Sequence, residues 1–271
     1  MGEFNEPIAA DIDDDRPIGR FLSRREILVL LGAAGTATAL AACAPAGGTP
    51  AASAAAPATA GTATGTPGAS ATAAAAIPSC VVVPELTEGP YYIDTNLERA
   101  DIRPDTTTGQ LAAGTSLALA FAVSILDGSA CVPLANAVVD AWHCDALGVY
   151  SGVSGNSGNF LRGVQRTDAN GAATITTIYP GWYSGRAVHI HFKVRTDPDN
   201  NAGYELTSQL FFSDETSRQV YAAAPYSSKG AQDITNDRDG IFQQSAGTTL
   251  LDARPSGGGY AATFSIALQT T

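Results

Sequence analysis

Large apolar residues recur at every second position in several short stretches after residue 115. The first stretch carries five of them with Ala or Ser between: Leu117, Leu119, Phe121, Val123 and Ile125. A later stretch sets Val188, Ile190, Phe192 and Val194 against His189, His191, Lys193 and Arg195. Because residues i and i+2 lie on the same face of a strand, each stretch predicts a strand with one apolar face.

Similar patterns predict further strands at residues 137–143, 173–179, 207–212 and 260–268. Turn-forming sequences such as Asp127-Gly128 separate them, and one short helix is expected over residues 213–223 with Ser213 as its N-cap. Short strands divided by such turns predict an all-β fold, an antiparallel β-sandwich with little helix. On that scaffold, long glycine-rich loops such as residues 151–163 are where functional residues are expected.

The first 42 residues follow a different pattern, typical of an export signal. Arg24 and Arg25 lead into an apolar run at residues 27–42. This run is short for a spanning helix, which needs about 20 apolar residues, and it fits a twin-arginine signal peptide. It ends in Leu40-Ala41-Ala42-Cys43, which resembles the lipobox of bacterial lipoproteins. Lipidation of Cys43 is therefore expected, and simple cleavage with release of a secreted protein is the alternative.

Residues 43–77 consist almost entirely of Ala, Gly, Thr, Pro and Ser. Such a segment buries too little surface to offset its ordering entropy and predicts a flexible tether. The folded domain is then expected at residues 78–271, long enough for one substantial core. The expected protein is exported by the twin-arginine route as a cell-surface or periplasmic lipoprotein, and touches the membrane through its lipid only.

Charge and cysteine content narrow the possible classes of protein further. Fifteen Lys and Arg residues stand against 26 Asp and Glu, a net charge of −11. This balance excludes a nucleic-acid binder that works by neutralising phosphates. In an exported domain, Cys80, Cys131 and Cys144 allow one disulfide and leave one thiol. The sequence does not fix this pairing, and Cys131 and Cys144 are not paired on proximity alone.

The histidine pair His189 and His191 offers the first candidate chemistry. Two neutral imidazoles on one face of a strand form half a metal site, although an ordinary surface pair has the same pattern. The nearby candidate donors are tyrosines: Tyr183 closes Pro180-Gly181-Trp182-Tyr183, and Tyr150 ends the stretch that begins at Trp142. A phenolate suits a ferric ion, and a bound cation lowers the phenol pKa from about 10. Two Tyr and two His thus match Fe(III).

Five segments, in this order, resemble the intradiol ring-cleavage dioxygenases. They are residues 87–92, 142–150, 167–171, 177–183 and 186–192. The similarity runs from about residue 80 to about residue 212 and is greatest to the secreted, protocatechuate-dioxygenase-like branch. It implies one Fe(III) per domain and cleavage of catechol-type rings by O2 between the two hydroxylated carbons, giving muconate-type diacids.

The resemblance also implies individual roles. The equatorial iron ligands would be Tyr150 and His191, and the axial ligands Tyr183 and His189. Tyr183 would be displaced by the substrate and then accept a proton.

Other positions of the family pattern lie around these ligands. Arg186 corresponds to an arginine that stabilises developing negative charge. The residues expected near the substrate are Gly89, Pro90, Tyr91 and Gln209. Outside that pattern, Trp142 and Trp182 are expected to pack, His143 to support the site or be exposed, and Lys193 and Arg195 to face solvent.

Two departures from the family pattern leave substrate and assembly open. Only Ser184 and Gly185 separate Tyr183 from Arg186, which predicts an open pocket mouth. The helical N-terminal dimerisation segment of the catechol-dioxygenase branch is absent, and the oligomeric state is not predicted. Two alternatives also fit parts of the sequence: a non-catalytic, surface-anchored β-sandwich binding module, and a zinc hydrolase.

Overall fold

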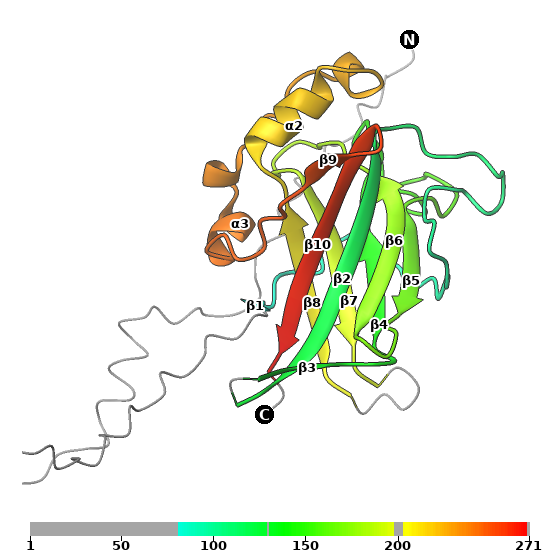
Figure 1. Cartoon of the computed structure of the whole chain (residues 1–271). Helices are drawn as coiled ribbons and strands as arrows, with labels where there is room; N and C mark the ends of the chain where they lie inside the picture. Colours follow the sequence, from blue (N-terminus) through cyan, green and yellow to red (C-terminus); the bar gives the residue numbers. More distant parts are fainter. Residues whose placement is uncertain (1–80, 129, 198–202, 270–271) are drawn as a thin grey trace, which may run out of the picture. The chain divides into compact units, whose positions relative to one another are not determined.

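A computed structural model describes residues 81–128, 130–197 and 203–269 of the chain. The expectations for the signal peptide, Cys43, the tether and Cys80 lie outside these residues. The described residues contain ten strands in two sheets, with short helices to one side (Figure 1). The predicted all-β sandwich is thereby confirmed.

The larger sheet is built around strand β2, and six strands belong to it. They are β1 (Val81–Val82), β2 (Ser116–Asp127), β3 (Ala130–Pro133), β6 (Ala172–Ile178), β9 (Arg254–Ser256) and β10 (Gly259–Leu268). Strands β3 and β6 pair with β2 in antiparallel orientation, whereas β10 runs parallel to β2. The sheet is therefore mixed. A parallel pair is possible here because β2 and β10 come from opposite ends of the domain and are not joined by a hairpin.

The smaller sheet is antiparallel throughout and has the order β5-β4-β7-β8. Its strands are β4 (Val138–Trp142), β5 (Arg162–Arg166), β7 (His189–Arg195) and β8 (Glu205–Phe211). The sequence pattern predicted three of these and missed β5, which carries two arginines and a glycine. Gly163 is needed there because an added Cβ would lie 2.7 Å from the Ile102 side chain.

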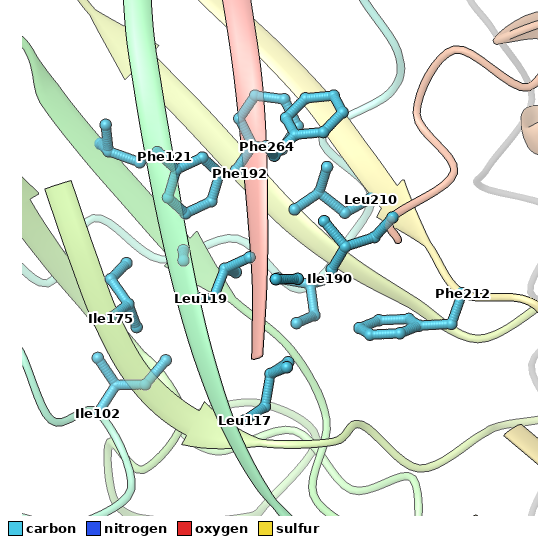
Figure 2. Packing of buried hydrophobic residues seen from close by; sticks show 14 of the residues in the cluster. Ile102, Leu117, Leu119, Phe121, Ile175, Ile190, Phe192, Leu210, Phe212 and Phe264 are labelled. Atoms are coloured by element: carbon cyan, nitrogen blue, oxygen red, sulfur yellow. The ribbon is translucent and has the colours of Figure 1, made fainter. Parts of the chain in front are cut away.

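The core lies between the two sheets and uses the alternating positions of the sequence. Leu117, Leu119 and Phe121 of β2 face Ile190 and Phe192 of β7 (Figure 2). The rings of Phe121 and Phe192 are 5.6 Å apart. Each of these side chains is almost completely buried, and such burial stabilises the fold by about 1.5–3 kcal/mol per side chain.

The other face of the smaller sheet is also covered, by residues 84–99, which we call the strap. The Leu86 amide donates to Thr207 O on β8, and Val164 N of β5 donates to Leu97 O. The prediction that Lys193 faces solvent is wrong for this reason. Lys193 is buried and forms ion pairs with Glu88 of the strap and Glu205 of β8. Arg195 is half-buried and pairs with Asp94 and Asp140.

The short helices follow β8. Helix α2 (Asp214–Tyr221) begins as predicted, with the Ser213 hydroxyl accepting a hydrogen bond from Thr216 N. The 3-10 turns η1 (Tyr226–Ser228) and η2 (Asn236–Arg238) and the short helix α3 (Gly240–Gln244) were not predicted. None of the helices in the described part of the chain has the length and apolar character needed to cross a bilayer.

Two cysteines of the described residues differ in state. Cys131 is disulfide-bonded, whereas Cys144 is a free, buried thiol. The two are therefore not paired with each other. Burial raises the pKa of the Cys144 thiol to about 12, so it stays protonated at neutral pH.

Candidate active site

The four candidate metal ligands come together at one end of the smaller sheet. His189 and His191 begin strand β7, Tyr183 lies in the loop before it, and Tyr150 lies in the loop after β4. The Tyr183 hydroxyl is 3.1 Å from His189 Nε2, which is 3.1 Å from His191 Nε2. The Tyr150 ring centre lies 5.8 Å from that of Tyr183 and 6.3 Å from that of His191. Three separate segments thus bring two phenols and two imidazoles into one cluster.

Both histidines direct Nε2 into this cluster. The Nδ1–H of His189 donates to the Ala187 carbonyl at 2.6 Å, so its Nε2 carries the lone pair that faces the Tyr183 hydroxyl. Burial, together with the nearby Arg186 cation, holds the pKa of His189 below its usual value. Burial and the His189 ring do the same to the pKa of His191. Both imidazoles are therefore neutral at pH 7, the form that binds metals.

Tyr150 carries a buried hydroxyl that no regular hydrogen bond satisfies. Its hydroxyl makes no hydrogen bond of regular geometry, and neither does His191 Nδ1. Burial, and then the neighbouring Tyr183 phenol, raise the pKa of Tyr150 well above its usual value. Leaving a buried hydroxyl without a partner costs about 1–3 kcal/mol, so this oxygen marks a place where a cation fits.

The chemistry of these donors indicates which metal fits. No cluster of three or more His, Cys, Asp or Glu side chains suited to a metal occurs among the described residues. A metal centre there would need the two phenols in addition to the two imidazoles. Nitrogen donors with hard, anionic phenolate oxygens fit a ferric ion better than zinc, which prefers Cys, His and carboxylate ligands.

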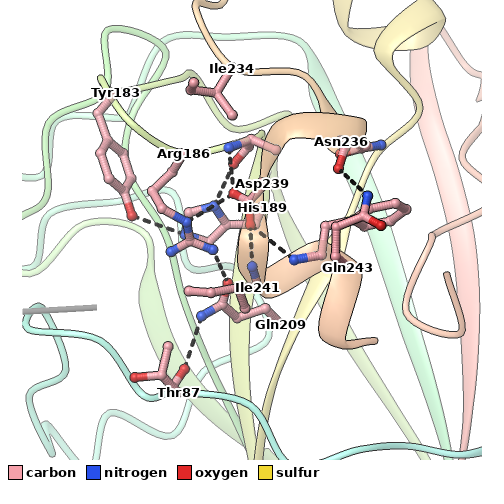
Figure 3. Close-up of polar contacts among 12 residues, drawn as sticks. Thr87, Tyr183, Arg186, His189, Gln209, Ile234, Asn236, Asp239, Ile241 and Gln243 are labelled. Carbon is pink, nitrogen blue, oxygen red and sulfur yellow. Dashed lines mark hydrogen bonds and ion pairs between the residues drawn. The ribbon is translucent and has the colours of Figure 1, made fainter. Parts of the chain in front are cut away.

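Arg186 is held from two sides next to this cluster (Figure 3). Its Nε donates to Asp239 Oδ2 at 2.9 Å, and Nη2 donates to Gln209 Oε1 at 2.6 Å. Gln209 in turn donates from Nε2 to Thr87 O of the strap at 2.9 Å. Burial opposes ionisation of Asp239, but the Arg186 guanidinium and the backbone N–H groups of Phe242 and Ala187 together keep the pKa of this carboxyl below its usual value.

Asp239 is the functional residue that sequence reasoning missed. Its carboxylate also accepts hydrogen bonds from Ala187 N and, as the N-cap of α3, from Ile241 N and Phe242 N. The pattern Asp239-Gly240 has the composition of an ordinary turn, and 53 positions separate it from Arg186. Only the N-cap preference of Asp before a short apolar run could have drawn attention to it.

A pocket opens beside the two tyrosines, with a volume of about 170 Å³. Its lining residues are Tyr91, Gly148, Val149, Tyr150, Val153, Ser154, Asn156 and Tyr183. The Tyr91 ring stacks on Tyr150 at 4.5 Å and meets Tyr183 edge-on at 6.0 Å. Of the residues expected near a substrate, Tyr91 lines this pocket. Gly89 (φ 73°) turns the chain toward it, Pro90 is exposed, and Gln209 reaches the site through Arg186.

The neighbouring aromatic residues have packing roles, as predicted. Trp142 stacks on His191 with ring centres 5.0 Å apart, and Trp182 donates to Gly230 O. His143 is fully buried rather than exposed. Its ring nitrogens contact Thr177 Oγ1 at 2.6 Å and Cys144 O at 2.8 Å, so neither is free for a metal.

Comparison with known proteins identifies the family of this chain. A family model described as Dioxygenase matches residues 87–231, more than half of the chain. Chlorocatechol 1,2-dioxygenase from Pseudomonas putida is 34% identical over 99 residues, covering 29% of this chain and 36% of that protein. Catechol 1,2-dioxygenase 1 from Acinetobacter lwoffii is 30% identical over 153 residues, covering 47% and 45%. The chain thus matches less than half the length of these curated relatives.

A solved structure is similar over a larger share of its length. The intradiol ring-cleavage dioxygenase from Tetranychus urticae is 28% identical, with a TM-score of 0.61. The similar region covers 70% of this chain and 95% of that one. Since the family match spans more than half of the sequence and the fold agrees, the protein belongs to the Dioxygenase family of intradiol ring-cleavage enzymes.

Proposed function

We propose that this protein is a non-haem Fe(III) dioxygenase that cleaves catechol-type rings between their two hydroxylated carbons. Both atoms of O2 enter the product, a muconate-type diacid. The family uses non-haem iron. The observation that carries the proposal is the convergence of Tyr150, Tyr183, His189 and His191, with the Tyr150 oxygen buried and without a regular hydrogen bond.

Each of the four side chains has a distinct part in holding the iron. Tyr150, His189 and His191 are buried and supply fixed donors, whereas Tyr183 is half-exposed at the pocket. When bound, the ferric ion would supply Lewis acidity toward a catechol and a redox centre for its reaction with O2. The partial exposure of Tyr183 suits a side chain that moves aside and accepts a proton from a catechol hydroxyl at its Oη.

Arg186 and Tyr91 act on the substrate. The Arg186 guanidinium is preorganised by Asp239 and Gln209, and a fixed cation there stabilises negative charge that develops on the ring and its oxygens. Tyr91 provides a flat wall stacked on Tyr150, against which an aromatic ring can lie. The site thus binds, orients and polarises a catechol.

Oxygen uptake with a panel of catechols tests this function directly. The iron-loaded protein should be red-brown from phenolate-to-iron charge transfer and should consume one O2 per catechol, with a muconate-type product identified by mass. A colourless protein that holds iron but consumes no O2 with any catechol would contradict the proposal. It would favour a non-catalytic binding module, whereas zinc in place of iron on metal analysis would favour a zinc enzyme.

The pocket lining predicts a preference among catechols. All eight lining residues are uncharged at neutral pH. A ring carboxylate that lies against these residues, away from Arg186, would lose water without gaining a cation, which costs at least about 1.4 kcal/mol, a factor of ten. We expect kcat/KM for protocatechuate to be at least about tenfold below that for catechol or a methyl- or methoxy-catechol. Equal values for both classes would contradict this, and would agree with the protocatechuate-like branch that the sequence resembles.

We also propose, from the sequence alone, that the protein is exported by the twin-arginine route and anchored through a lipid on Cys43. Cys43→Ala should move the protein from the membrane to the soluble fraction, because the substitution removes the proposed lipid anchor. As a control, Arg24→Lys with Arg25→Lys should block export itself. Sedimentation of the Cys43→Ala protein with membranes would overturn the lipobox interpretation.

A further inference from the structure

The strap crosses every strand of the smaller sheet before the chain enters the rest of the fold. On β8, Ser208 Oγ donates to Pro84 O, and Leu86 N donates to Thr207 O, both at 2.9 Å. At the far edge, Val164 N of β5 donates to Leu97 O at 2.8 Å. Between these edges the strap carries Tyr91, which forms a wall of the pocket.

The middle of the strap is tied to β7 by one buried cation. Lys193 Nζ lies 2.6 Å from Glu88 Oε2 and 2.8 Å from Glu205 Oε1. It also sits over the Tyr92 ring, 4.2 Å from its centre. Only 7% of the Lys193 side chain is exposed, whereas Glu88 and Glu205 are 42% and 50% exposed. A buried ammonium needs such partners, so both carboxylates are held close to it.

The two carboxylates differ in what they attach. Glu205 belongs to β8, which already pairs with β7 along its whole length, so its contact joins strands that the sheet holds anyway. Glu88 belongs to the strap and directly precedes Gly89, where the chain turns with a positive φ. Its contact with Lys193 therefore fixes the part of the strap that leads into Tyr91.

Two aromatic residues that follow Gly89, Tyr91 and Tyr92, connect the strap to the candidate active site. Tyr91 stacks on Tyr150 at 4.5 Å. Tyr92 packs on Trp142 at 4.8 Å, and Trp142 stacks on His191 at 5.0 Å. The strap thus contacts one metal-binding candidate, Tyr150, directly, and reaches a second, His191, through Trp142.

We propose that the Lys193–Glu88 ion pair is a positioning device that holds Tyr91 as the pocket wall. Lys193 and Glu88 are neither pocket-lining residues nor candidate ligands, and they act through Tyr91. The expected change in KM rests on the proposed dioxygenase function, whereas the expected change in the mobility of the strap does not. Losing the tie should leave the metal site assembled and loosen the substrate pocket.

Glu88→Ala and Glu205→Ala form a matched pair for the test. Each removes one partly exposed carboxylate from the same ammonium and leaves the other, so loss of charge and of bulk is equal. Glu88→Ala should raise KM for catechol about three- to tenfold, the effect of one charge-assisted contact, with kcat within about twofold. Iron content and visible colour should be unchanged. Glu205→Ala should change none of these quantities.

Hydrogen exchange on the metal-free protein gives a readout independent of activity. Backbone amides around residue 88 should exchange faster in Glu88→Ala than in Glu205→Ala, because only the former variant loses a contact between the strap and β7. Equal exchange in the two variants, or equal KM values, would overturn the inference. Faster strap exchange in Glu88→Ala with no O2 uptake by any form of the protein would leave the tie established and reject the dioxygenase function.

Discussion

Tyr150→Phe should abolish iron binding and colour without destabilising the metal-free protein. The Tyr150 hydroxyl is buried and makes no regular hydrogen bond, so its removal relieves an unsatisfied polar group. The melting temperature of the metal-free variant should therefore equal or exceed that of the parent. Because an anionic donor is lost, we expect iron content to fall sharply and ring cleavage to drop by at least about 100-fold. Iron analysis, absorption spectra and thermal unfolding measure the three quantities.

Tyr179→Phe is the matched control. The Tyr179 hydroxyl is also buried, but it bonds to Ser217 Oγ at 2.8 Å, and its ring packs on Phe212, Tyr221 and Tyr260 rather than on a metal ligand. Its loss should cost about 1 kcal/mol of stability and leave iron and colour intact. A Tyr150→Phe protein that keeps its iron and colour, or that unfolds far more easily, would show that Tyr150 has a structural role instead.

Arg186→Met should reduce kcat by about 100-fold or more, because a preorganised charge next to the reacting ring is lost. It should also lower stability by about 3–5 kcal/mol, since the Asp239 carboxylate is left buried without its cation. Iron content should stay at the parent level because no ligand is changed. Steady-state kinetics and chemical unfolding separate the two effects.

The double variant Arg186→Met with Asp239→Asn distinguishes catalysis from folding. Removing both charges should restore most of the stability, while activity should remain low. The stability difference should also depend on pH. Because Arg186 lowers the Asp239 pKa in the folded state, the stabilisation exists above the unfolded carboxyl pKa of about 4 and is lost as pH falls further. Recovered activity in the double variant would contradict the catalytic role of Arg186. A stability difference between the parent and Arg186→Met that does not change with pH would contradict the role of the Arg186–Asp239 pair.

The sequence predicted those parts of the fold that depend on local patterns. The alternation around Ile190 and Phe192 identified strand β7 and its core face, because side-chain period is a local property of a strand. The same period placed His189 and His191 together. Tyr150 and Tyr183 required the family resemblance, since no local rule places a loop tyrosine next to a histidine of another segment.

What the sequence could not predict depends on contacts between distant segments. The parallel pairing of β2 with β10 is not encoded near either strand. Lys193 was assigned to solvent because the strap that buries it comes from more than a hundred positions earlier, as the Glu88 contact shows. Asp239 was missed for the same reason, because its partnership with Arg186 exists only in the folded chain.

The central position of β2 has a consequence for biogenesis. Its neighbour β10 is made last among the described strands, and Phe264 and Ile266 on it complete the core. Until β10 leaves the ribosome, one edge of β2 and part of the apolar interior stay uncovered, which makes non-local closure slow and invites aggregation. Nascent chains of this protein should therefore need a holding chaperone until late in translation. A C-terminal tag would adjoin β10 and could interfere with the step that completes the core.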